Sequence, residues 1–180
     1  MGGALAVRSA RRDDAAAIAA IYAHYVRNSV ITFELDPPDA ATMAVRMDSI
    51  LPLYPYLVTE CDGVLLGYAY AGRLYDRAAY RWTAEATVYV AHEWHRRGIG
   101  HMLYAALIAA LAAQGFQSVV GKITLPNPAS TLLHEACGFR QVGLLAKVGY
   151  KQDAWHDVGI YQLELGTRPV GPEEPRPFLA

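Results

Sequence analysis

The sequence predicts an α/β domain built on a mixed β-sheet. Stretches with helical apolar spacing alternate with strand-like stretches, and an Asp62-Gly63 pair joins two of the strand-like ones. The chain has 180 residues, of which 53% are apolar and 18% charged, so it can bury a substantial core. We expect a single domain over residues 1–166 and a poorly ordered, proline-rich tail over residues 167–180.

The N-terminal part is predicted to form one strand and two helices. Residues 5–8 are a short strand-like stretch, followed by Asp13 and Asp14, whose negative charge favours the start of a helix. The first helix is indicated by an apolar stripe at helical spacing, Ile18, Ile21, Tyr22 and Tyr25. The second helix, which ends before Pro52, is indicated by a similar stripe, Met43, Met47, Ile50 and Leu51.

The middle of the chain is predicted to form three strands and a long helix. Residues 56–61 and 64–71 flank the Asp-Gly turn as a hairpin. Residues 82–90 alternate between two kinds of side chain, which gives that strand two unlike faces. A helix from about residue 98 to residue 114 carries a leucine every four residues, and Gly115 follows as the residue that terminates it.

The C-terminal part is predicted to complete the sheet. A strand over residues 118–124 precedes a short helix over residues 129–137 and a turn at Gly138-Phe139. Residues 142–148 and 158–165 are two further strand-like stretches, and we expect them to pair with each other.

Charge and hydropathy argue against two classes of partner. The formal net charge is −1, whereas nucleic-acid-binding proteins usually carry an excess of Lys and Arg. The longest apolar run, residues 102–113, is shorter than the roughly 20 residues that cross a bilayer. The first residues lack the basic and apolar pattern of a secretory signal. We expect a protein with no nucleic-acid partner and no membrane partner.

The cysteines and histidines predict no metal site. Cys61 and Cys137 lack the spacing of a zinc site or a disulfide framework, which favours the reducing cytoplasm as the location. His92 and His95 flank Glu93, but the second histidine comes one residue too early for a zinc-binding helix face.

The most informative stretch is residues 88–101, where a strand, a basic loop with two glycines and a long helix follow one another. Backbone N–H groups at a helix N-terminus lack intrahelical partners, and glycine lets a phosphate approach them. The loop is therefore a plausible pyrophosphate site, although a simple turn with two glycines is an equally good interpretation. A dinucleotide motif would need a third glycine at Leu103, and a Walker loop would need Gly-Lys-Ser/Thr at Gly100-His101-Met102.

The loop also carries a resemblance to a known family. Arg96-Arg97-Gly98-Ile99-Gly100 resembles the coenzyme A loop of the GNAT N-acetyltransferases, Gln/Arg-x-x-Gly-x-Gly/Ala, although His95 stands at the leading position. Further blocks resemble phosphinothricin acetyltransferase and its relatives that act on methionine sulfone or sulfoximine: residues 82–90, 113–120, 125–127, 133–136 and 155–159. The resemblance covers about residues 18–165.

The resemblance implies a GNAT fold, with a central, mixed, mostly antiparallel twisted sheet flanked by helices. It also implies transfer of an acetyl group from acetyl-CoA to the α-amino group of phosphinothricin, methionine sulfoximine or methionine sulfone, without an acyl-enzyme, by a homodimer. The acetyl-CoA contacts that it implies are Val88, Tyr89 and Val90 along the strand, Arg96, Arg97, Gly98, Ile99, Gly100 and His101 around the pyrophosphate, and Asn127 on the pantetheine arm.

Two residues are candidates for the chemistry. Only a neutral amine attacks a thioester, and an α-amino group with a pKa of about 7.7 to 8.0 is partly protonated in the cell. The resemblance assigns the general base to Glu85; without it, a solvated or salt-bridged strand carboxylate is the better interpretation. His134 stands where many GNAT enzymes have a tyrosine that protonates the departing thiolate, so it is a candidate acid, assisting base or structural residue.

The acceptor amino acid needs a partner for its carboxylate. Arg77 is a candidate for a bidentate contact, with Arg73 as the alternative. The other residues that match acceptor-pocket positions of the family, beside Glu85, are Phe33, Tyr80 and Thr87. Two other functions stay open: an acetyltransferase for a peptide N-terminus or a polyamine, and a non-catalytic acetyl-CoA-binding module.

Overall fold

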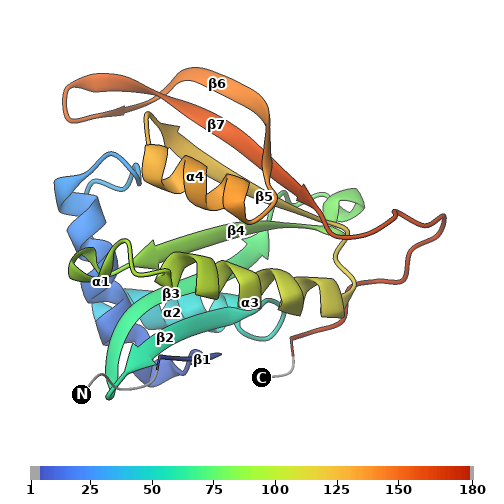
Figure 1. The fold of residues 1–180 in the computed structure, drawn as a ribbon, viewed down its shortest axis with the longest axis horizontal. Coiled ribbons are helices and arrows are strands. Elements are labelled where there is room, and N and C mark those ends of the chain that lie inside the picture. The colour runs from blue at the N-terminus through green and yellow to red at the C-terminus, as the bar shows by residue number, and fades with distance from the viewer. Residues whose placement is uncertain (1–4, 179–180) are drawn as a thin grey trace.

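A computed structural model of the protein describes residues 5–178 and shows one sheet with helices on both faces (Figure 1). The strands are β1 (Ala6–Ser9), β2 (Tyr56–Cys61), β3 (Val64–Arg73), β4 (Thr83–Val90), β5 (Ser118–Leu125), β6 (Arg140–Lys151) and β7 (Ala154–Glu164). The α-helices are α1 (Ala15–Asn28), α2 (Ala40–Ile50), α3 (Ile99–Gln114) and α4 (Pro128–Ala136). Short 3-10 helices are η1 (Arg12–Asp14), η2 (Ala78–Tyr80) and η3 (His92–Trp94).

The strands lie in the order β1-β2-β3-β4-β5-β7-β6. Neighbouring strands are antiparallel except β4 and β5, which are parallel. A mixed, mostly antiparallel sheet is therefore confirmed. The single parallel pair needs a crossover, and α3 supplies it between β4 and β5.

Two apolar clusters attach the helices to the sheet. On one face, α1 and α2 bury Ile18, Val26 and Met47 against tyrosines of β2 and β3. On the other face, α3 buries the leucines Leu103, Leu107 and Leu111. The predicted helical stripes therefore mark the sides of the helices that face the sheet. None of the helices within residues 5–178 has the length and apolar character needed to cross a membrane.

The predicted turns have the backbone conformations that their residues favour. Asp62 and Gly63 have φ angles of 49° and 78°, the left-handed pair that a tight hairpin between right-twisted strands requires. Gly115 has a φ of 98° and its N–H donates to the carbonyls of Leu111 and Ala112, which ends α3.

The last two strands are longer than predicted. A turn at Gln152 and Asp153, both with positive φ, lets the pairing of β6 and β7 extend to Lys151 and Ala154. A shift in register between Leu145 and Gly149 absorbs the polar residue Lys147, whose N–H donates to Asp157 Oδ1 at 2.7 Å. Polar residues inside this hairpin interrupt the strand pattern in the sequence without interrupting the strand pairing.

The C-terminal tail lies against the domain. Residues 167–178 form no regular element, but they run along the end of α3, where Gln114 Nε2 donates to Arg176 O at 2.7 Å and Arg176 N donates to Gln114 O at 2.8 Å. Trp82 Nε1 donates to Glu173 O at 2.8 Å, and Phe178 packs against the core under α3. These contacts hold the extended chain against the domain, although the sequence of the tail has no local preference for a regular element.

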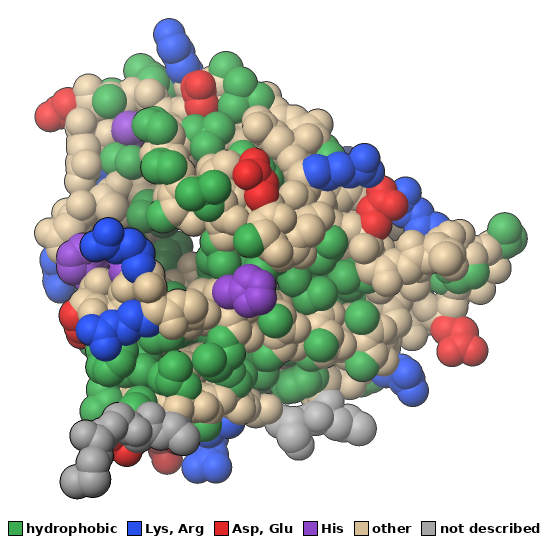
Figure 2. Space-filling model, viewed as in Figure 1, with side chains coloured by type: hydrophobic (Ala, Val, Ile, Leu, Met, Phe, Trp, Pro, Cys, Tyr) green, Lys and Arg blue, Asp and Glu red, His purple; other side chains and the backbone are tan. Residues whose placement is uncertain are grey.

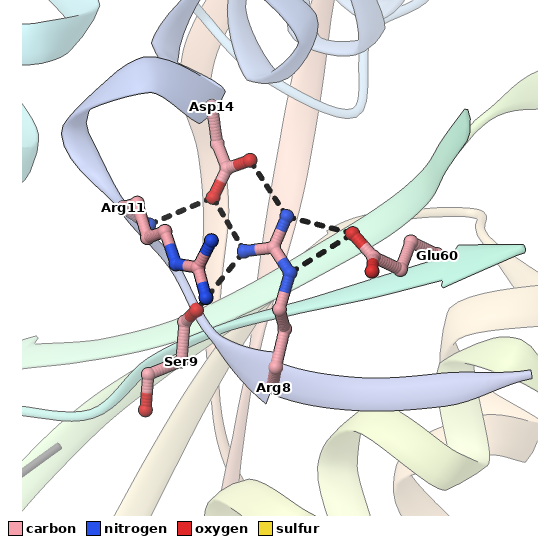
Figure 3. A network of polar contacts seen from close by, with 5 residues as sticks. All are labelled: Arg8, Ser9, Arg11, Asp14 and Glu60. Atoms are coloured by element: carbon pink, nitrogen blue, oxygen red, sulfur yellow. Dashed lines mark hydrogen bonds and ion pairs between the residues drawn. The ribbon is translucent and has the colours of Figure 1, made fainter. Parts of the chain in front are cut away.

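An ion-pair network joins the N-terminal strand to the rest of the sheet (Figure 3). Arg8 on β1 contacts Asp14 at 2.7 Å and Glu60 on β2 at 2.7 Å. The hydrogen bond from Arg8 is the main reason that the pKa of Asp14 lies below its ordinary value. Asp14 also accepts the Arg11 N–H at 2.7 Å, which holds the turn that leads into α1.

Candidate functional site

The parallel strands β4 and β5 part beyond a short region of pairing. Thr83, Ala84 and Glu85 pair with residues 118–120, and neither strand pairs with the other after that, although β4 continues to Val90 and β5 to Leu125. A cavity of about 190 Å³ lies where they separate. Its walls are Ile31, Thr32, Glu85, Ala86, Thr87, Val88, Tyr89, Tyr104, Lys122, Ile123, Thr124, Asn127, Ser130 and His134.

The alternation along β4 places Glu85 on the side of the sheet away from α3. Ala84 and Ala86 pack into the core under α3, so the residues between and after them, Glu85 and Thr87, face the other way. Glu85 Oε2 lies 2.7 Å from Lys122 Nζ on β5, and both side chains are partly exposed. The carboxylate is therefore held at the rim of the cavity by an ion pair and keeps contact with solvent.

His134 is buried at the bottom of the cavity. Its Nδ1 lies 2.7 Å from Ser130 O, which can only accept, so Nδ1 carries the proton. Its Nε2 lies 3.0 Å from the Tyr104 hydroxyl on α3 and accepts the hydrogen bond that this hydroxyl donates. Burial lowers the pKa of His134 below its ordinary value and raises that of Tyr104, so both groups stay neutral at physiological pH.

The histidine ring also explains a glycine on β5. A Cβ placed on Gly121 would lie 2.5 Å from His134 Nε2. Only glycine leaves room for the ring at this point, so β5 and α4 can approach closely enough to bring His134 to Tyr104.

The loop before α3 forms an open, basic helix N-terminus. Gly98 has a φ of 79° and precedes the first helical residue, and a Cβ at this glycine would meet nothing within 4 Å. Arg96 and Arg97 are exposed, and the Arg97 guanidinium lies 4.5 Å above the ring of Trp94. In Figure 2, Lys, Arg and His side chains gather beside a hollow on the face shown.

Two side chains in or next to the predicted loop site make their contacts within the protein. The side chain of Ile99 is 1% exposed and belongs to the core, so it offers only its backbone. His95, at the position where the family has Gln or Arg, places Nε2 2.7 Å from the Tyr25 hydroxyl, which in turn donates to Val90 O. His95 therefore ties the loop to α1, and the Val90 carbonyl already has a partner.

Asn127 begins α4 at the edge of the cavity. Its Oδ1 accepts the Ser130 N–H at 3.1 Å, which caps the helix, with Pro128 at the first helical position. Asn127 follows the end of β5 between Pro126 and Pro128, and it lines the cavity as well.

The candidate acceptor residues are only partly brought together. Thr87 lines the cavity, and Phe33 lies on the loop after α1 directly over Gly149 of β6, where a Cβ would come 2.1 Å from its ring. Tyr80 and Arg77 lie on an exposed segment outside the cavity walls. Arg73 lies 3.9 Å from Asp76 in an exposed ion pair.

The exposed segment that carries Arg77 and Tyr80 contacts the rim of the cavity through the ring of Tyr75. Tyr80 packs edge-on against Tyr75, with 4.9 Å between ring centroids. Lys122 Nζ, the partner of Glu85, lies 5.8 Å from the centre of the Tyr75 ring. This contact links the exposed segment to the rim of the cavity.

Three residues of the site escape sequence reasoning: Tyr104, Lys122 and Lys151. Lys122 has the one sequence signal, a charge inside the apolar strand β5. Lys151 is 5% exposed and its Nζ donates to Val26 O at 2.7 Å and to Thr32 O at 2.9 Å. Burial lowers the pKa of Lys151. The end of β6 is thereby fastened to the loop that forms one wall of the cavity.

The block 155–159, which had no assigned role, shapes the same hairpin. His156 Nε2 lies 3.0 Å from Lys151 O, Asp157 accepts the Lys147 N–H, and Trp155 packs against Tyr150 on the outside. Among residues 5–178, no group of three or more His, Cys, Asp or Glu side chains is arranged to hold a metal ion.

Known proteins are similar to this chain in sequence and in fold. A family model described as an acetyltransferase (GNAT) domain matches residues 7–160. A phosphinothricin N-acetyltransferase from Streptomyces viridochromogenes is 43% identical over 170 residues, covering 92% of this chain and 93% of that protein. An L-methionine sulfoximine/L-methionine sulfone acetyltransferase from Pseudomonas aeruginosa is 35% identical over 161 residues, covering 88% and 94%.

A solved structure agrees with both sequence matches. The crystal structure of a GNAT superfamily phosphinothricin acetyltransferase from Sinorhizobium meliloti, in complex with AcCoA, superimposes with a TM-score of 0.87 and 35% identity. The superposition covers 93% of this chain and 94% of that one. The resemblance and the fold predicted from the sequence are confirmed.

Proposed function

The chain belongs to the GNAT acetyltransferase family, and from this premise we propose that it transfers an acetyl group from acetyl-CoA to the α-amino group of a small amino acid. The acceptors are phosphinothricin, methionine sulfoximine and methionine sulfone, the compounds named in its relatives. The observation that carries the proposal is the cavity between β4 and β5 with the Glu85 carboxylate at its rim.

The residues of the chain fit acetyl-CoA. The open space at Gly98 lets a phosphate approach the helix N-terminus, and the exposed side chains of Arg96 and Arg97 supply positive charge beside it. Residues 96–101 would hold the pyrophosphate, and the backbone of residues 88–90 together with Asn127 would hold the pantetheine arm. When bound, acetyl-CoA supplies an acetyl group activated as a thioester.

Glu85 acts as the general base. It accepts the proton that the attacking amine releases, directly or through one water, so that nitrogen bonds to the acetyl carbon as the carbon–sulfur bond breaks. Lys122 holds the Oε2 atom of the Glu85 carboxylate in place. The other carboxylate oxygen, Oε1, has no partner among the described residues. Such a base contributes roughly 10² to 10⁴ in rate.

His134 acts through Tyr104. Both ring nitrogens of the neutral histidine are engaged, one by Ser130 O and the other by the Tyr104 hydroxyl. The histidine therefore orients the hydroxyl of Tyr104, a residue that lines the cavity, rather than protonating a leaving group itself. Of the roles open for His134 in the sequence, we propose the positioning one.

On the acceptor side, Phe33 and Thr87 form walls and Arg77 binds the carboxylate, with Tyr80 beside it. The ring contacts from Tyr80 through Tyr75 to Lys122 support this assignment, because they connect the exposed segment to the rim at Glu85.

A thiol-release assay tests the function. Purified protein with acetyl-CoA should release thiol when methionine sulfone, methionine sulfoximine or phosphinothricin is added. A panel that includes a peptide and a polyamine separates the alternatives. Turnover of the peptide or polyamine alone would contradict the amino-acid proposal, and binding of acetyl-CoA without any turnover would favour a non-catalytic module.

We also propose that the protein is a homodimer. The outer edge of β6 pairs with none of the described strands, and apolar side chains project along the β6–β7 hairpin, with Leu144, Val148 and Trp155 at least half exposed. An exposed apolar edge of this length is typical of an interface. Light scattering should give twice the chain mass of 19.7 kDa, and Leu144→Lys should shift it toward the monomer. A monomeric mass for the unaltered protein would refute the dimer.

The cytoplasm is the compartment that we propose. Cys61 and Cys137 are both free, as a reducing compartment favours. Labelling by a thiol reagent under non-reducing conditions in cell extract tests this assignment.

A further inference from the structure

The chain between β3 and β4 has few anchors of its own. We call residues 75–81 the η2 segment, and all of its residues are exposed. Its ring of Tyr75 lies 5.8 Å from Lys122 Nζ. Its Asp76 lies 3.9 Å from Arg73, in a pair whose two side chains are both more than half exposed. A segment with so few buried contacts opens at a low cost in free energy, so contacts from other parts of the chain decide its position.

The C-terminal tail supplies such contacts at the end of the η2 segment. Trp82 Nε1 donates to Glu173 O at 2.8 Å, and the carboxylate of Glu174 forms an ion pair with Arg81. Two consecutive tail residues therefore contact the two residues that lead from the η2 segment into β4. Figure 1 shows how the tail reaches this place, because it leaves the end of β7 and turns back toward the end of α3.

Arg81 carries the tail contact into the η2 helix. Its guanidinium pairs with Glu174, and its Nε donates to Ala78 O at 2.8 Å. The donors of a guanidinium form a rigid planar fork, so a carboxylate on one arm also fixes the direction of the other. Ala78 is the first residue of η2, and Arg77 directly precedes it. The tail therefore holds the turn that presents Arg77 and Tyr80.

The tail is itself fixed on both sides of Glu174. Before it, Leu165 N donates to Gln117 O at 2.9 Å, where the chain leaves the sheet. After it, Arg176 N donates to Gln114 O at 2.8 Å, and Gln114 Nε2 donates back to Arg176 O at 2.7 Å. Phe178 packs against the core under α3. The end of α3 is thus the rigid base from which residues 173 and 174 hold the η2 segment.

We propose that residues 173–176 are a strap that positions the η2 segment for the acceptor amino acid, with Glu174 and Trp82 as positioning residues for Arg77. The inference rests on the proposed function, in which Arg77 binds the acceptor carboxylate. Neither positioning residue is part of the cavity wall. When only a fraction of the molecules has the binding conformation, the apparent affinity falls by that fraction. A segment that is already held in place avoids this loss.

Glu174→Gln tests the strap at an exposed position. The amide keeps the size of the side chain and removes the charge that pairs with Arg81. The KM for methionine sulfone should rise by about 2- to 5-fold at low salt, as the strength of exposed ion pairs predicts. The kcat should stay unchanged, because saturating substrate orders the segment, and so should the KM for acetyl-CoA. Salt at 0.5 M should bring the variant and the unaltered protein together, since it screens the pair.

A double variant removes the second contact as well. Trp82→Phe keeps an aromatic ring but lacks the N–H that donates to the tail. Together with Glu174→Gln, it should raise the same KM by about 5- to 50-fold. Amide hydrogen exchange should become faster over residues 75–81 in both variants, while exchange within α3 stays the same. The exchange measurement reports the position of the segment without any substrate.

Glu164→Gln is the matched control. It makes the same chemical change at an exposed glutamate that pairs with Arg140 and Arg168 instead of Arg81. Both KM values and the exchange of residues 75–81 should stay as they are in the unaltered protein. Circular dichroism melting establishes that each variant is folded.

The outcomes separate the strap from the proposed function. If Glu174→Gln and the double variant match Glu164→Gln in KM and in exchange, the strap is overturned while the acetyltransferase function stands. An equal rise in the KM of both substrates, or a lower kcat with unchanged KM, would also overturn it, since either result places the effect outside the acceptor side. Unaltered protein that acetylates none of the amino acids would overturn the proposed function itself.

Discussion

Replacing Glu85 by Gln should lower kcat for amino-acid acetylation by about 10²- to 10⁴-fold and leave acetyl-CoA binding intact. The amide has nearly the shape of the carboxylate, but it cannot take a proton from the attacking amine. Residual turnover should then depend on pH only through the amine, because deprotonated substrate must come from solution. Steady-state rates across a pH series, with calorimetric titration of acetyl-CoA, measure both effects.

The ion pair with Lys122 requires its own control. Glu85→Gln also removes the charge partner of Lys122 at 2.7 Å. Lys122→Met removes the same ion pair but keeps the carboxylate, so it should retain far more activity than Glu85→Gln. Equal losses in the two variants, or an unchanged pH–rate profile in Glu85→Gln, would place the base elsewhere.

Replacing Lys151 by Met should weaken the acceptor side of the site and destabilise the fold. The substitution keeps the apolar stem but leaves the carbonyls of Val26 and Thr32 without their donor. Each buried carbonyl left unpaired costs about 1 to 3 kcal/mol of unfolding free energy. The loop that carries Thr32 and Phe33 should then move away from β6, raising the KM for the amino acid more than the KM for acetyl-CoA.

Urea unfolding and a comparison of the two KM values measure this prediction. Lys151→Arg supplies the conservative control, because it keeps a cation that can donate to the same carbonyls and should restore part of the lost acceptor affinity. Arg140→Met provides a matched loss of an exposed cation, since Arg140 on β6 pairs with Glu164 at the surface. If Lys151→Met behaves like Arg140→Met, the buried lysine does not position the loop.

Much of the fold follows from local patterns in the sequence. The apolar stripe containing Ile18 and Tyr25 predicts α1 and the side of it that packs on the sheet. The Asp62-Gly63 pair predicts the hairpin between β2 and β3, because its residues favour the left-handed conformations of a tight turn. These signals are strong because each depends only on residues within one or two turns of chain.

The weaker predictions concern segments whose structure depends on distant partners. Pro-rich residues 167–178 have no local preference for order, and it is Gln114 and Trp82 that dock them. The hairpin of β6 and β7 contains polar residues between the two predicted strands, and residues 149–151 become strand only by pairing with residues 154–156.

The site divides in the same way. The glycine loop, the strand that carries Glu85 and the helix that begins after Asn127 can be recognised from the sequence, because spacing places these residues at element ends and on defined faces. The pairing of Glu85 with Lys122 and of His134 with Tyr104 joins residues 37 and 30 positions apart. No local pattern encodes such contacts, since they depend on how far β4 and β5 separate and on how closely α4 approaches β5 at Gly121.

A cavity of about 220 Å³ between α2 and the sheet, lined by tyrosines, shows the same limit. The sequence contains 12 tyrosines against 4 phenylalanines, which indicates aromatic surfaces with polar ends. Only the register of β2, β3 and β4 brings Tyr56, Tyr70 and Thr87 into one row, and only the packing of α2 above them encloses a space. Composition and spacing are properties of the chain, whereas a cavity is a volume left between elements, and its walls exist only once those elements have packed.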